Sequence, residues 1–160
     1  MKKLFSNILV AVTGSDASIM AAKYAIVTAK LYNCHLNVLY VVDTATIKQL
    51  TLNKIFIQAE GAEYEKSMEA NGQRYLAFVE ELANAKGVKI SKEIRKGAVH
   101  TEIITAANNH KADLILLGGW ESGRSSKDII GHIHREVMNN SKCSVLLVKE
   151  PEINEIYKHT

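Results

Sequence analysis

The sequence has little proline, cysteine or tryptophan, and these shortages help to exclude whole classes of protein. Its 160 residues include one proline, two cysteines and one tryptophan. Because 47% of the residues are apolar and charges of both signs are mixed along the chain, a disordered or fibrous protein is excluded. Cys34 and Cys143 lie far apart and lack the spacing of metal ligands, so we expect reduced thiols in a cytoplasmic protein.

Long apolar runs and clusters of a single charge are also missing. No stretch approaches the roughly 18 apolar residues that a membrane-spanning helix needs. The apolar start of the chain is interrupted by Ser6 and Asn7, so we interpret it as the lead-in to a core strand and not as a signal peptide. A net charge of only +3, without a run of lysine or arginine, predicts that the protein binds neither nucleic acid nor a membrane surface.

Apolar runs and helical periodicity alternate along the chain. The apolar runs predict five strands, at 7–13, 35–42, 88–94, 112–119 and 143–150. Apolar residues at helical spacing predict four helices, at 17–31, 57–85, 100–110 and 126–140. This alternation predicts a single α/β domain with a parallel sheet and helices on both of its faces. The stretch 43–56 has no clean period, so a lid, a partner-binding surface and a plain connection all stay open.

The ends of two predicted strands are the candidate site. In a parallel sheet, ligands bind beyond the carboxyl ends of the strands, where the strand order reverses. The first strand is followed by "TGSD" at 13–16, and the fourth by "GGWESGRSS" at 118–126. We interpret Gly14 as a turn residue and Ser15 or Asp16 as the helix cap, and we assign no nucleophile to this turn.

No pattern typical of a catalytic or metal site accompanies these loops. The GxSxG nucleophile elbow is absent, and no motif indicates a Ser/His/Asp arrangement. His132 and His134 are two residues apart on a predicted helix, so they cannot share a face. We therefore expect two surface histidines and no metal ion.

Three segments taken together resemble the universal stress protein family. They are "ILVAVTGSDAS" at 8–18, "KGAVHTEIITAANNHKADLILLGG" at 96–119 and "GHIHREVMNNSKCSVLLVK" at 131–149. The resemblance implies a family domain at 1–150, followed by a C-terminal tail at 151–160. It also implies an adenine-nucleotide alpha-hydrolase-like fold, whose five-stranded parallel sheet has the order 3-2-1-4-5 with helices on both faces. A homodimer through the last strand, at 143–149, is implied too, and it would cover an apolar edge that otherwise favours aggregation.

Many members of this family bind ATP through a G-x2-G-x9-G-S/T motif, with an aspartate at the end of the first strand. Gly118 and Gly131 match the first and third glycines. Glu121 stands in place of the second glycine, His132 in place of the hydroxyl residue and Thr13 in place of the aspartate. Carried over position by position, the resemblance implies a nucleotide site formed by Ala11, Val12, Thr13, Val41, Leu117, Gly118, Glu121, Gly123, Gly131, His132 and Ile133.

The departures from the motif differ in their expected effect on nucleotide binding. Glu121 adds a side chain and a negative charge where the backbone has to approach a phosphate, so it would repel a triphosphate. Thr13 offers one hydroxyl, whereas a carboxylate can accept from both ribose hydroxyls. His132 keeps its backbone N–H for an anion. Gly123, two residues beyond Glu121, could restore a rearranged site together with the hydroxyls and positive charges of the same loop.

These departures leave three functions open. The leading hypothesis is a non-catalytic regulatory protein of the stress response, with a degenerate adenine-nucleotide pocket and protein partners. A competent ATP sensor that uses a rearranged loop at 118–126 is the alternative within the binding class. A slow ATPase is the alternative among enzymes, with Glu121 of that loop and Asp128 just after it as the acids. ATP thus stays an open ligand, and Mg²⁺ is expected only together with ATP.

Overall fold

The computed structural model describes residues 1–119 and 127–160, and of residues 127–130 only the backbone. The strands are β1 (Asn7–Val12), β2 (His35–Asp43), β3 (Ile90–Gly97), β4 (Leu114–Gly118) and β5 (Ser144–Val148). The helices are α1 (Asp16–Tyr32), α2 (Thr44–Leu52), α3 (Gln58–Asn84), α4 (Val99–Asn109), α5 (Lys127–Asn140) and α6 (Ile153–Lys158). Among these described helices, none is long and apolar enough to cross a membrane. Every predicted strand and helix is present, and α2 and α6 are additional.

The strands form one parallel sheet in the order β3-β2-β1-β4-β5, which confirms the predicted fold. On one side β1 pairs with β2, where Asn7 lies opposite His35. On its other side β1 pairs with β4, where Ile8 lies opposite Leu114. The chain builds outward from β1 to β3 and then crosses back to β4, so the strand order reverses between β1 and β4. The carboxyl ends of these two strands are therefore where a ligand pocket is expected.

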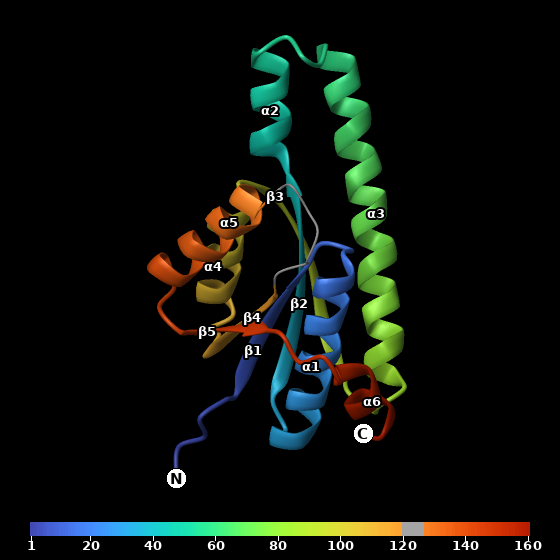
Figure 1. Ribbon diagram of the computed structural model, residues 1–160, viewed down its shortest axis with the longest axis vertical. Helices are drawn as coiled ribbons and strands as arrows, with labels where there is room; N and C mark the ends of the chain where they lie inside the picture. The colour runs from blue at the N-terminus through green and yellow to red at the C-terminus, as the bar shows by residue number, and fades with distance from the viewer. Residues whose placement is uncertain (120–126) are drawn as a thin grey trace.

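Helices cover both faces of the sheet, with α1 and α3 on one side and α4 and α5 on the other (Figure 1). Successive residues of β1 alternate between the two buried clusters that result. Val10 packs in the cluster on the α1 and α3 side, and Leu9 packs in the cluster on the α4 and α5 side. Because both faces of the strand are buried, β1 has an unbroken apolar run instead of an alternating pattern.

Residues 43–56, which have no clean apolar period, contain α2. This helix packs beside the start of α3, beyond the carboxyl ends of the strands (Figure 1). Asp43 caps it, because its Oδ1 accepts a hydrogen bond from the Thr46 N–H at 3.0 Å. Ile47 is 8% exposed, whereas Leu52 is 71% exposed. Since few apolar residues of α2 face α3, the segment shows no continuous apolar stripe.

The last helix, α6, lies against α1 and near the end of α3 (Figure 1). Ile153 is only 1% exposed, and the Tyr157 hydroxyl donates to the Leu82 carbonyl oxygen at 2.6 Å. The ammonium groups of Lys23 and Lys86 lie 5.6 and 4.6 Å from the centre of the Tyr157 ring, within range of a cation–π attraction. Residues after β5 therefore contribute buried contacts to the fold.

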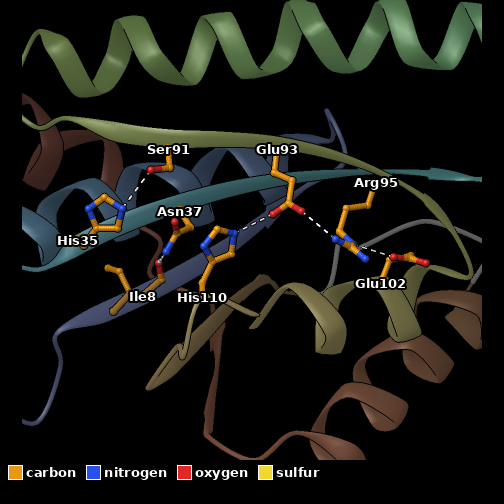
Figure 2. A network of polar contacts seen from close by, with 8 residues as sticks. All are labelled: Ile8, His35, Asn37, Ser91, Glu93, Arg95, Glu102 and His110. Atoms are coloured by element: carbon orange, nitrogen blue, oxygen red, sulfur yellow. Dashed lines mark hydrogen bonds and ion pairs between the residues drawn. The ribbon is translucent and has the colours of Figure 1, made fainter. Parts of the chain in front are cut away.

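A chain of polar contacts joins the edge strand β3 to α4 (Figure 2). The Glu93 carboxylate lies 2.8 Å from His110 Nε2 and 2.9 Å from Arg95 Nη1, and Arg95 Nε donates to Glu102 at 2.7 Å. Burial disfavours the charge on Glu93, but the hydrogen bonds with His110 and Arg95 outweigh it and hold the pKa of this carboxyl below its ordinary value. The ionised form of Glu93 therefore stabilises the packing of β3 against α4.

We expect this stabilisation to disappear in acid. A carboxyl whose folded-state pKa lies below its unfolded value of about 4.3 stabilises the fold above that pH. The contribution is lost as the pH falls through the folded-state pKa. Glu93→Gln should therefore lower the free energy of unfolding by about 1 kcal/mol near neutral pH and by much less below about pH 3.

Urea unfolding of the wild type and the variant at both pH values measures the difference. Glu80→Gln is the matched control. It removes the ion pair of Glu80 with Lys92, which lies on the same strand as Glu93, and both side chains of this pair are more than a third exposed. Its effect should be close to zero at either pH. A loss for Glu93→Gln that is equally large in acid would contradict the prediction.

Candidate functional site

A pocket of about 250 Å³ lies where β1 and β4 end, at the reversal of the strand order. Besides these strands, β2 and the starts of α1 and α4 contribute walls, and α5 closes another side. The described residues that line the pocket are Ala11, Val12, Thr13, Ser15, Ala17, Ser18, Val41, Val99, Ile103, Leu117, Gly118, Gly119, Ile133 and His134.

The turn between β1 and α1 is held together by the hydroxyls of two serines. Ser18 Oγ accepts from the backbone N–H groups of Thr13 and Gly14, both at 3.1 Å. Ser15 Oγ accepts from the Ser18 N–H at 3.1 Å, so Ser15, and not Asp16, is the cap of α1. The Thr13 hydroxyl in turn donates to Ser15 Oγ at 3.0 Å. Much of the hydrogen-bonding capacity of "TGSDAS" is therefore used to fix the turn.

Packing explains both glycines at the end of β4. A Cβ atom on Gly118 would lie 2.8 Å from the Ala17 carbonyl carbon and 2.9 Å from the Ser18 nitrogen, which are backbone atoms of α1. Gly119 donates its N–H to the Val148 carbonyl oxygen at 2.9 Å, and a Cβ atom there would clash with that oxygen. The residue that matches the first glycine of the motif is thus required by the fold, whether or not a nucleotide binds.

The α5 side of the pocket presents Ile133 and His134. His134 is half-buried, and burial lowers the pKa of its imidazole, while a hydrogen bond with the Gly118 backbone acts in the opposite direction. His132 is exposed, and its ring meets the His100 ring edge-on with centroids 5.7 Å apart. The predicted surface position is therefore confirmed for His132 and wrong for His134. Because the two histidines point in different directions from the helix, one of them can face the pocket.

The structure brings most of the residues implied by the family resemblance to one place. Seven of them line the pocket, namely Ala11, Val12, Thr13, Val41, Leu117, Gly118 and Ile133. Gly131 and His132 lie on α5 but are not part of the lining. Glu121 and Gly123 lie outside the described residues.

The other lining residues were not singled out from the sequence as site residues. Val99 and Ile103 are four residues apart at the start of α4, so they share a helix face. That spacing, combined with the strand order, could have indicated them. Ser15 and Ser18 could be recognised only as parts of a turn, since nothing in their spacing distinguishes a pocket wall from a helix cap. One feature of the sequence could have indicated that His134 faces inward. It lies three residues before Val137 on the same helix face, and Val137 is fully buried.

The described walls suit a largely apolar group. Val41, Val99, Ile103, Leu117 and Ile133 give the pocket aliphatic walls, and small-molecule sites combine such walls with few polar groups. A purine base fits this chemistry. The described lining offers no carboxylate for a ribose, because Thr13 holds the position where the motif has an aspartate. Within the described part of the chain, no group of three or more His, Cys, Asp or Glu side chains could hold a metal ion.

A model of the universal stress protein family matches residues 4–149. The chain belongs to this family. A universal stress protein of Methanocaldococcus jannaschii is 32% identical over 153 residues, which cover 94% of this chain and 86% of that protein. The membership predicted from three short segments is therefore confirmed, and the match extends over nearly the whole of this universal stress protein.

Solved structures share the fold of this universal stress protein. A family member from Burkholderia pseudomallei has a TM-score of 0.73 at 20% identity, with 92% of this chain and 98% of that chain covered. A universal stress protein of Archaeoglobus fulgidus in complex with dAMP has a TM-score of 0.64 at 15% identity, with 91% and 99% covered. Another universal stress protein, in complex with cAMP, has a TM-score of 0.59 at 21% identity, with 91% and 97% covered.

Gly118→Ala should destabilise the protein in the absence of any nucleotide. Because the added methyl group meets the backbone of α1, the structure has to shift, and we expect a loss of about 2–3 kcal/mol in the free energy of unfolding. Gly87→Ala is the control, since Gly87 has a φ of +71° but no heavy atom within 4 Å of the added carbon. Urea unfolding should show a loss of about 1 kcal/mol for this control. If Gly118→Ala lowers the free energy of unfolding by no more than the control does, β4 does not approach α1 as closely as the structure shows.

Proposed function

We propose that this universal stress protein is a non-catalytic regulatory protein that binds an adenine nucleotide weakly between β1 and β4. The observation that carries the proposal is the apolar pocket at the reversal of the strand order, lined by seven of the residues that the family motif implied. Proteins of the same fold form the complexes with dAMP and cAMP described above, which supports an adenine nucleotide as the ligand class.

The apolar walls would hold the base. Val41 at the end of β2, Ile103 of α4 and Ile133 of α5 come from three different elements and line one pocket. Covering a base on several sides removes apolar surface from water, which stabilises the complex by roughly 25 cal/mol for each Å² buried. The contact would favour a purine over the smaller ring of a pyrimidine, because the larger ring buries more surface.

Thr13 is the reason to expect weak binding. Its hydroxyl already donates to Ser15 Oγ at 3.0 Å, and it has no second oxygen. A carboxylate at this position could accept from two ribose hydroxyls at once. Hydrogen bonds to charged groups contribute about 1.5–3 kcal/mol, so the loss of such a contact weakens binding by a factor of roughly 10 to 100.

The chemistry of the described lining supports a non-catalytic role. Hydrolysis of a nucleotide needs a group that holds a metal ion or positions water. The described lining provides three hydroxyls of the β1–α1 turn and one imidazole, that of His134. Glu121 and Asp128, the acids that an ATPase would use, lie outside the described side chains, so they are tested by phosphate release from ATP. The described lining by itself favours binding over turnover.

Calorimetric titration with AMP tests the proposal. We expect a dissociation constant of about 100 µM, which corresponds to about 5.5 kcal/mol. Val41→Phe should weaken binding at least about tenfold, because the added ring occupies the space of the base. Val145→Phe is the matched control, since Val145 is also half-buried on the α4 and α5 side of the sheet but lies outside the pocket. Its affinity for AMP should equal that of the wild type.

Two results would contradict the proposal. The first is the absence of heat with millimolar AMP in a wild-type protein free of co-purified nucleotide. The second is an equal affinity for AMP in Val41→Phe and the wild type. Thermal unfolding first shows that Val41→Phe and Val145→Phe are both folded. Release of phosphate from ATP and Mg²⁺ by the purified protein would favour the ATPase alternative over a non-catalytic role.

A further inference from the structure

His134 is the one titratable side chain among the described residues that line the pocket. It comes from α5 and is half-buried. In the part of the chain that the structure describes, the imidazole of His134 has one hydrogen-bonding contact, with the backbone of Gly118. An imidazole has two ring nitrogens, so this one described contact leaves the other nitrogen for a ligand.

The remaining polar groups of the described lining belong to the turn between β1 and α1. Ser18 Oγ accepts from two backbone N–H groups and donates to the Ser15 carbonyl oxygen at 2.9 Å. Ser15 Oγ caps α1 and also accepts from the Thr13 hydroxyl. Because these hydroxyls are committed to the turn, His134 is the described side chain with most capacity left to recognise a polar or charged ligand group.

We propose that His134 is a specificity-determining residue of this pocket, which recognises the phosphate of the ligand and binds it more tightly as imidazolium than as neutral imidazole. This inference rests on the proposed function, since it assigns the phosphate contact within the same site. The position lies outside the glycine motif that the family resemblance carries over.

The surroundings of His134 make its charge responsive to a ligand. Burial lowers the pKa of the imidazole, so the neutral form predominates near neutral pH in the free protein. A bound phosphate brings a negative charge against the ring, which favours the imidazolium. Because binding and protonation stabilise each other, the affinity for a ligand whose phosphate keeps its charge rises as the pH falls.

Within the described lining, no charged side chain from the neighbouring elements could contact the phosphate in place of His134. The lining residues of α1 and α4 are alanine, serine, valine and isoleucine, and those of β4 and its end are Leu117, Gly118 and Gly119. His100 of α4 lies outside the lining and contacts His132. Lys149, after β5, lies beside Gly119 but is also outside the lining. Among the residues that the structure describes, no charged side chain shifts the pKa of His134.

Titration with cAMP at two pH values tests this inference. The phosphodiester of cAMP carries one negative charge between about pH 5.5 and pH 8, so a change in affinity over this range reports on the protein. We expect wild-type protein to bind cAMP several-fold more tightly at the lower pH. A rise of about one unit in the pKa of one histidine on binding tightens it by up to about tenfold, and the full gain is reached only well below the pKa of the free protein.

His134→Gln keeps a polar side chain of similar size without a titrating ring, and its affinity should not depend on pH. His132→Gln is the matched control on the same helix and should behave as the wild type. Adenosine, which has the same base but no phosphate, should bind wild-type protein with no gain at the lower pH.

The outcomes separate this inference from the function on which it rests. If wild-type protein binds cAMP with no dependence on pH, or if His134→Gln keeps the dependence, His134 does not recognise the phosphate. An equal gain for adenosine would also overturn the inference, because the effect would then not involve the phosphate. If neither cAMP nor adenosine binds wild-type protein at either pH, the proposed function itself fails.

Discussion

The end of β4 runs so close to the first turn of α1 that position 118 has no room for a side chain. This contact fixes where the two halves of the sheet meet, because β4 pairs directly with β1, the strand that leads into α1. Leu117 and Gly118 of β4, Thr13 and Ser15 of the β1–α1 turn and Val41 of β2 thereby line the same pocket. The shape of the pocket is therefore a consequence of the packing of β4 against α1.

This constraint separates two kinds of position in the motif. Gly118 is needed for the fold, so its presence says little about whether a ligand is bound. Thr13 is exposed and is held by hydrogen bonds with Ser15 instead of by close packing, so another hydrogen-bonding side chain could replace it without loss of the fold. If tight binding of ATP is not required, the fold still requires the glycine at position 118, but it does not require an aspartate at position 13. The pocket can persist in this way while its affinity falls.

The strands could be predicted from the sequence because their burial leaves a direct pattern. Residues 8–12 are apolar without interruption since both faces of β1 are covered, and the strand order followed from the family resemblance. The helix α6 has no such signal. Its buried anchor Ile153 and its Tyr157 bond to Leu82 depend on where α1 and α3 lie in space. Position 134 could not be assigned either, because which of two histidines on a helix faces inward depends on how α5 packs.

The affinity of Thr13→Asp for adenosine is the most direct test of the nucleoside site proposed between β1 and β4. Adenosine has both ribose hydroxyls and no phosphate, so the titration isolates the contact that the threonine lacks. The account predicts that the aspartate tightens binding at least about tenfold over the wild type, while Thr13→Asn, which has one acceptor oxygen and no charge, gains less. If the Thr13→Asp protein folds normally and binds adenosine no better than the wild type, the pocket between β1 and β4 does not hold the nucleoside as proposed.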